Sequence, residues 1–64
     1  MQKIEIPTPE EILTLRTSAS LTQEEAGEIV HVARRTFQDW ERGVASMPLG
    51  LWELFRLKIQ LSRK

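Results

Sequence analysis

The sequence predicts a single all-α domain of four helices, or five, on the basis of three observations. Apolar residues recur at helical spacing along most of the chain. No segment shows the apolar–polar alternation that is typical of strands. Capping boxes, together with a proline and a glycine at helix-end positions, divide the chain into short helical segments. Its 64 residues are near the lower limit for a domain that folds alone.

The first helix is expected to follow an extended N-terminal arm at residues 1–7. Thr8 is the expected N-cap, and Pro9 suits the first helical position because its missing N–H is not needed there. Glu11 stands three residues after Thr8 and completes a capping box. Residues 17–20 are polar and weakly helical, so we expect the helix to end there.

A second capping box, Thr22 with Glu25, predicts the start of the second helix. Leu21 and Ala26 can form a hydrophobic staple around that start. The helical pattern breaks at His31.

Residues 34–42 are expected to form the third helix, which Gly43 ends. Phe37 and Trp40 give it a narrow apolar face, whereas Ala33 at the N-cap position offers no capping side chain. Its opposite face is charged or polar and consists of Arg34, Arg35, Gln38 and Asp39.

Pro48 is expected to open a fourth helix that reaches residue 59 or 61. The apolar positions of this helix cover roughly 200° of the helical wheel, whereas a core-facing helix needs only about 100°. The surplus predicts a second buried contact, most simply with another copy of the chain. The residues assigned to this homodimer interface are Trp52, Phe55, Leu57, Ile59 and Leu61. The domain would thus span residues 8–61, with a short tail at 62–64.

Composition argues against several classes of protein. The chain has no cysteine and one histidine, so we expect no disulfide, no metal site and no cofactor. Paired carboxylates and glycine-rich phosphate motifs are also missing from the sequence, so we do not expect an enzyme. No secretory leader and no apolar stretch of about 18 residues is present. We therefore expect a cytoplasmic protein that makes no membrane contact and has no evident small-molecule effector.

The net charge is zero, but the charge is unevenly distributed. Residues 1–28 hold two basic and six acidic side chains, a net charge of −4, whereas residues 29–64 hold seven and three, a net charge of +4. A binding face can therefore be positive on a neutral molecule. The alternative is the ordinary charge of solvated helix surfaces.

Residues 22–43 are the most informative segment, because they predict two short amphipathic helices joined by a tight turn. A helix-turn-helix uses this arrangement to place its second helix in the major groove of DNA. The segments Leu-Thr-Gln-Glu-Glu at 21–25 and Trp-Glu-Arg-Gly at 40–43 resemble the lambda-repressor-like, or Cro/Xre, helix-turn-helix family. The resemblance covers about residues 10–59. Residues 47–49 and 52–55 are also similar to small phage or mobile-element regulators, including those encoded beside anti-CRISPR genes.

The resemblance implies which residues would contact DNA. Arginine can bond guanine and glutamine can bond adenine through two hydrogen bonds, so the base-reading residues would be Arg34, Arg35, Gln38 and Asp39. Asp39 would accept from a cytosine amine or would orient Arg35 or Arg42. The residues assigned to DNA phosphates are Thr22, Gln23, Thr36, Arg42 and Ser46. The alternative for Gln23 and for the base-reading face is a helix surface exposed to water, and the alternative for Thr36 is a structural role with its methyl group packed.

The resemblance also implies structural features. Arg16 and Glu41 match family residues that form an ion pair beneath the third helix. His31 stands where the family commonly has a glycine with a left-handed backbone, which other residues adopt at a cost. Gly27 stands where the family usually has alanine, at a close approach of helices two and three.

These features together predict a sequence-specific regulator of transcription that binds double-stranded DNA. We expect a dimeric repressor on an inverted-repeat operator, with repression of its own operon as one form. The alternative is an antitoxin or another protein-interaction module that uses the apolar surface of the fourth helix.

Overall fold

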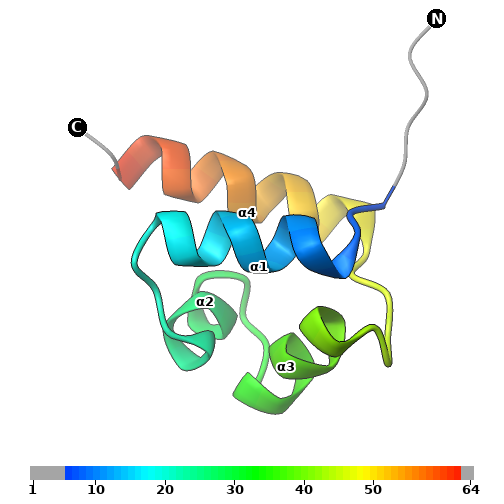
Figure 1. Ribbon diagram of the computed structural model, residues 1–64. Helices are drawn as coiled ribbons and strands as arrows, with labels where there is room; N and C mark the ends of the chain where they lie inside the picture. Colours follow the sequence, from blue (N-terminus) through cyan, green and yellow to red (C-terminus); the bar gives the residue numbers. More distant parts are fainter. Residues whose placement is uncertain (1–5, 63–64) are drawn as a thin grey trace, which may run out of the picture.

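The computed structural model describes residues 6–62, and within this range it contains α-helices and no strand. The helices are α1 (Pro9–Ser18), α2 (Gln23–Ile29), α3 (Arg34–Arg42) and α4 (Leu49–Ser62). The predicted all-helical class is confirmed over this part of the chain. In Figure 1, α1 and α4 form an upper layer, and the shorter α2 and α3 lie beneath them.

The predicted arm and tail fall largely outside the described range, because residues 1–5 and 63–64 are not described. Pro7, at the end of the predicted arm, is buried, and Ser62 is the last residue of α4. Among residues 6–62, no helix combines the length and the apolar character needed to cross a membrane.

Reciprocal capping boxes start α1 and α2, as the sequence predicts. Glu11 N donates to Thr8 Oγ1 at 3.1 Å, and Thr8 N donates to Glu11 Oε1 at 2.9 Å. Thr22 and Glu25 repeat these two bonds at the same distances. Each box satisfies N–H groups that have no partner within the helix, so both starts are fixed by local contacts.

The ends of α3 also agree with the sequence. Ala33 is the N-cap and makes no side-chain capping bond. Gly43 follows the last turn with φ of +80°, a left-handed conformation that glycine adopts without steric cost.

The core collects apolar side chains from all four helices and from the loop before α4. Phe37 of α3 lies at its centre, with its ring centroid 5.5 Å from that of Trp40 and 5.3 Å from that of Phe55. Met47 is fully buried, although its loop position gave no sign of this in the sequence. Within the described range the buried core is formed by Ile12, Ala26, Val30, Phe37, Trp40, Met47, Phe55 and Ile59.

The structure corrects part of the predicted dimer surface on α4. The assignment is wrong for Phe55 and Ile59, which are 0% and 3% exposed and belong to the core of the single chain. Trp52 is partly buried against the same core. Leu57 and Leu61 remain, at 53% and 65% exposed. The wide apolar arc of α4 is thus mostly covered within one chain, because the helix packs against more than one neighbour.

The chain between α2 and α3 turns sharply at His31. The φ of His31 is +64°, so the left-handed conformation that the family resemblance implies is present. Ser20, between α1 and α2, has φ of +61°, which the sequence did not indicate.

Gly27 allows α2 to approach this turn closely. Its carbonyl accepts from Val32 N at 2.9 Å. A Cβ atom at Gly27 would lie 2.8 Å from the carbonyl oxygen of Val32, closer than real Cβ contacts come. The position therefore requires glycine in this chain, and the alanine typical of the resembled family would force the backbone to move.

We expect His31→Gly to preserve or raise stability. Glycine relieves left-handed strain of about 1–2 kcal/mol, which raises the free energy of unfolding. Its extra freedom in the unfolded chain lowers that free energy by about 0.5–1 kcal/mol. Thermal unfolding followed by circular dichroism should show an unchanged or higher Tm, and His31→Ala, which keeps the strain, should melt below His31→Gly. A Tm for His31→Gly clearly below that of the natural chain would show that the imidazole makes a stabilising contact.

Candidate nucleic-acid interface

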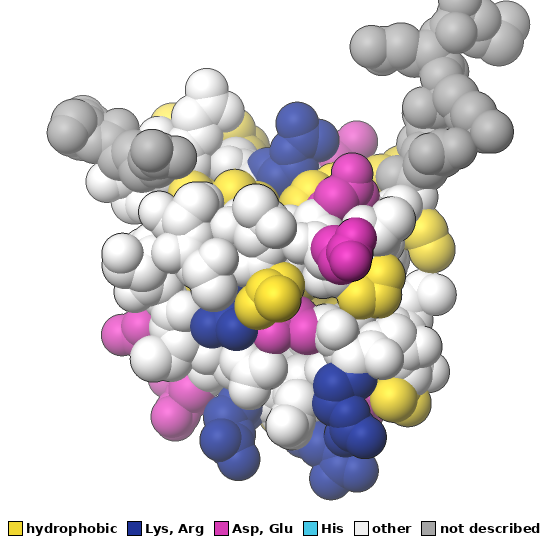
Figure 2. Space-filling view, in the orientation of Figure 1, with side chains coloured by type: hydrophobic (Ala, Val, Ile, Leu, Met, Phe, Trp, Pro, Cys, Tyr) yellow, Lys and Arg dark blue, Asp and Glu magenta, His cyan; other side chains and the backbone are white. Residues whose placement is uncertain are grey.

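The third helix, α3, lies along one edge of the molecule with its apolar side inward. Phe37 and Trp40 are buried, at 0% and 4% exposed. Figure 2 shows Lys and Arg side chains along the lower edge, where Figure 1 places α3. Of the predicted base-reading residues, Arg34 and Arg35 are exposed, and Gln38 and Asp39 are partly buried; Arg42, at the end of the helix, is exposed.

Helical spacing organises the outward side of α3 into rows. Side chains four residues apart lie one above the other, so Arg34 and Gln38 form one row and Arg35 and Asp39 form the next. Arg35 Nε lies 3.6 Å from Asp39 Oδ1, and the two side chains are 79% and 25% exposed. An exposed pair of this kind adds only a few tenths of a kcal/mol to stability.

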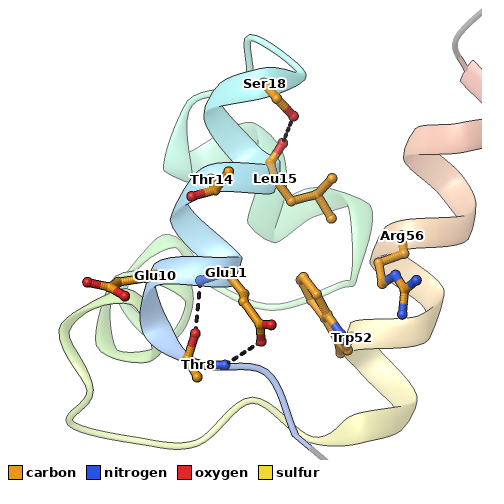
Figure 3. Close-up of a pocket in the computed structure, with 8 residues that line it drawn as sticks. All are labelled: Thr8, Glu10, Glu11, Thr14, Leu15, Ser18, Trp52 and Arg56. Carbon is orange, nitrogen blue, oxygen red and sulfur yellow. Dashed lines mark hydrogen bonds between the residues drawn. The ribbon is translucent and has the colours of Figure 1, made fainter.

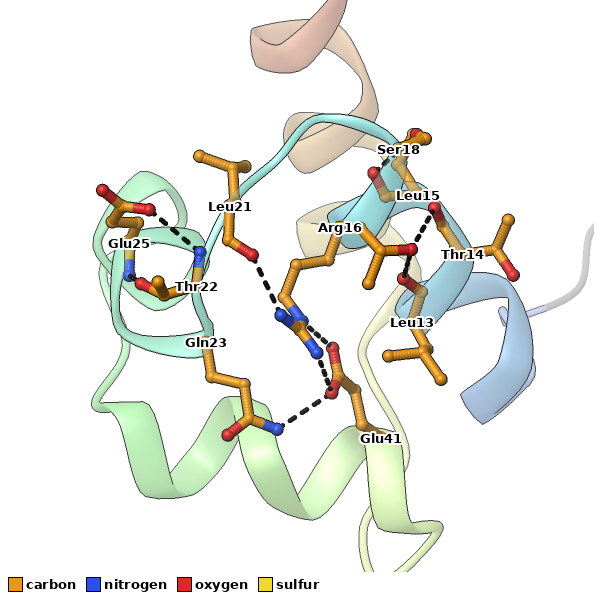
Figure 4. A network of polar contacts seen from close by, with 11 residues as sticks. Leu13, Thr14, Leu15, Arg16, Ser18, Leu21, Thr22, Gln23, Glu25 and Glu41 are labelled. Atoms are coloured by element: carbon orange, nitrogen blue, oxygen red, sulfur yellow. Dashed lines mark hydrogen bonds and ion pairs between the residues drawn. The ribbon is translucent and has the colours of Figure 1, made fainter.

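A second ion pair, between Arg16 and Glu41, joins α1 to α3 on the inner side of α3 (Figure 4). The structure thus contains the pair that the family resemblance implies. Arg16 Nε donates to Glu41 Oε2 at 2.5 Å, and Arg16 Nη2 donates to Glu41 Oε1 at 3.1 Å. The side chains are 15% and 6% exposed, and the two parallel bonds fix their mutual orientation.

Two further hydrogen bonds extend this pair to the start of α2 (Figure 4). Gln23 Nε2 donates to Glu41 Oε1, and Arg16 Nη1 donates to the carbonyl of Leu21, both at 2.9 Å. The sequence predicted only a phosphate contact for Gln23. Its bond to Glu41 was missed because the two residues are far apart in the chain and no local motif links them.

The structure brings two of the predicted phosphate contacts together with a predicted base-reading residue. Thr22 and Gln23 line one open cavity of about 520 Å³ with Arg34, and Arg16 and Glu24 complete its lining. The hydroxyl of Thr22 already accepts the capping bond.

The other predicted phosphate contacts lie away from that cavity. Arg42 is exposed at the end of α3, and Thr36 is partly buried. Ser46 is exposed in the following loop and lines a separate cavity beside Trp40 and Met47.

A groove of about 720 Å³ lies between α1 and α4 (Figure 3). Its polar groups are largely engaged in local contacts. Glu11 is bonded to Thr8, and Ser18 Oγ donates to the carbonyl of Leu15. Arg56 lies 5.7 Å from the ring centroid of Trp52. No cluster of three or more His, Cys, Asp or Glu that could hold a metal ion occurs within residues 6–62.

No protein-family model matches this chain, and no curated protein sequence matches it.

We expect loss of either member of the Arg16–Glu41 pair to be strongly destabilising. Removing one partner of a buried pair leaves an uncompensated charge, which costs about 3–5 kcal/mol. Urea unfolding of Arg16→Met, Glu41→Gln and the double variant should therefore give losses that are far from additive. The exposed pair is the matched control, since Arg35→Met and Asp39→Asn should each cost about 1 kcal/mol or less. Similar losses for the two pairs would contradict a structural role for Glu41.

Proposed function

We propose that this protein is a sequence-specific regulator that binds double-stranded DNA, and that α2, the turn at His31 and α3 form a helix-turn-helix of the lambda-repressor-like fold. The observation that carries the proposal is the two-sided character of α3. Two buried aromatic rings anchor this helix, and its opposite side carries the exposed Arg34 and Arg35 and the partly buried Gln38 at an edge of the molecule.

The dimensions of α3 suit the proposed role. An α-helix with its side chains is about 10–12 Å across, which matches the width of the major groove, about 12 Å. The nine residues of α3 give it a length of about 13.5 Å that can lie in the groove. Because the helix lies at an edge, a duplex can reach its outer side chains without displacing core residues. Arginine and glutamine are suited to guanine and adenine edges in that groove.

Residues beside α3 support contacts to the DNA backbone. Arg42 is exposed where α3 ends, and Gln23 is held next to Glu41 by one amide hydrogen. The second amide hydrogen and the carbonyl oxygen of Gln23 can still bond other groups. Such phosphate contacts would fix the register of α3 on the duplex without reading sequence.

We also propose that two copies bind an inverted repeat, with α4 contributing to the dimer contact. Leu57 and Leu61 are exposed and one helical turn apart, which favours burial against a second copy. Half-sites would then lie about one helical turn of DNA apart, or a multiple of it. The simplest regulatory consequence is repression, by blocking access of polymerase to the operator.

The same two leucines favour a second candidate function, that of an antitoxin or another module that binds a different protein through α4. The candidate is weaker than the sequence suggested, because Phe55 and Ile59 are not available at the surface. It also leaves the exposed arginines of α3, Arg34, Arg35 and Arg42, without a role.

We expect the purified chain to select a defined operator from random duplexes. Arg34→Ala, Arg35→Ala and Gln38→Ala should each reduce the preference for that operator, with a loss of about 1–3 kcal/mol for each base contact. Affinity measured by gel shift should fall steeply with salt, because phosphate contacts release counterions. A chain that binds no duplex, or alanine variants that keep both affinity and preference, would refute the proposal.

We expect the chain to sediment as a dimer, and Leu57→Glu to shift it to monomer, because a carboxylate would have to be buried at the contact. Leu13→Glu is the control, since it makes the same substitution at an exposed leucine of α1, outside the proposed α4 contact. If the natural chain sediments as a monomer at all concentrations, the proposed dimer is refuted. A natural chain that is insoluble alone and is rescued by a different protein would favour the second candidate.

A further inference from the structure

We propose that Arg35 and Asp39 act as one unit that reads a guanine–cytosine base pair, with Arg35 bonding the guanine and Asp39 positioning Arg35. The inference rests on the proposed DNA-binding function and extends it to the identity of one base pair. It decides between the roles that the sequence left open for Asp39.

The geometry of the pair leaves the outer edge of Arg35 free. The contact to Asp39 Oδ1 is made by Arg35 Nε, at 3.6 Å. The guanidinium has five N–H donors in a planar fork, and only Nε is in contact with Asp39, so the donors of Nη1 and Nη2 remain available. Guanine presents two acceptors, N7 and O6, in the major groove, and a planar pair of donors matches them.

Exposure separates the roles of the two side chains. The side chain of Arg35 is 79% exposed and can extend to a base edge, whereas that of Asp39 is 25% exposed and stays closer to the helix. The carbonyl of Asp39 also accepts from Val44 N and Ala45 N, at 3.0 and 3.3 Å. These two hydrogen bonds fix the backbone of Asp39, so its short side chain can hold the longer side chain of Arg35 in one orientation.

Charge supports the same division of roles. Phosphates repel a carboxylate on a DNA-facing surface, so Asp39 cannot add general affinity for DNA. Its presence there is explained if it restricts a flexible arginine to the orientation that meets guanine, because arginine loses less freedom on binding when it is already oriented.

The test measures base discrimination at each position of the selected operator. Fluorescence anisotropy would compare the natural chain with Arg35→Ala, Asp39→Asn and the double variant on duplexes that carry each single base-pair change. Glu10→Gln is the control, because it removes one negative charge from an exposed position of α1. Circular dichroism melting of every variant would confirm that each is folded.

We expect Arg35→Ala to abolish discrimination at one guanine–cytosine pair, a loss of about 5- to 150-fold. Asp39→Asn should weaken discrimination at that same pair and nowhere else, and should bind unrelated duplexes at least as tightly as the natural chain does. In the Arg35→Ala background, Asp39→Asn should have no further effect on discrimination. Asp39→Glu keeps the carboxylate, so it should lose less of the discrimination at that base pair than Asp39→Asn does. Glu10→Gln should leave the discrimination unchanged.

Three results would overturn the inference while leaving the proposed function intact. Arg35→Ala could weaken all sequences equally and lower the salt slope by about 1, which would make Arg35 a phosphate contact. Asp39→Asn could change preference at a different base pair, which would make Asp39 a base reader itself. Asp39→Asn could also leave the discrimination by Arg35 unchanged. If the natural chain bound no duplex, the proposed function would fail before any variant was compared.

Discussion

The carboxylate of Glu41 is the contact on which the relative placement of α1, α2 and α3 depends. It receives Arg16 from α1 and Gln23 from the start of α2, and it is itself part of α3. At 6% exposed, this charge is tolerable only because hydrogen bonds surround it. α2 has only seven residues, and α3 has no side-chain N-cap. Neither would be stable as an isolated helix, so contacts between helices must supply what local propensity lacks.

Helix boundaries proved predictable wherever the responsible contact is local. The boxes of Thr8 with Glu11 and Thr22 with Glu25 each join residues three positions apart, so the sequence alone displays them. Gly43 ends α3 for an equally local reason. The packing partners of α4 do not follow from local spacing, because a helical wheel shows which side chains are apolar but not which neighbour covers each of them. The sequence pattern therefore places Phe55 at a dimer surface, whereas the structure buries it in the core of the single chain.

In the candidate interface, too, features set by local spacing are predictable from the sequence, and features set by contacts between distant residues are not. The outward placement of Arg34 and Arg35 follows from helical period once Phe37 and Trp40 are known to face inward. The bond from Gln23 to Glu41 joins positions 18 residues apart, and no spacing rule encodes it. The requirement for glycine at position 27 likewise depends on a backbone carbonyl beyond the turn, whose position only the folded chain defines.

The separation of the two sides of α3 has a consequence for how such a protein can evolve. Exposed residues such as Arg34 contribute nothing to the core, so their replacement leaves the packing of Phe37 and Trp40 unchanged. Duplicate copies of the gene could therefore diverge toward different targets through a few surface codons while they inherit one unaltered scaffold. Retargeting would be constrained mainly where two neighbouring side chains must change together, as they would for Arg35 and Asp39.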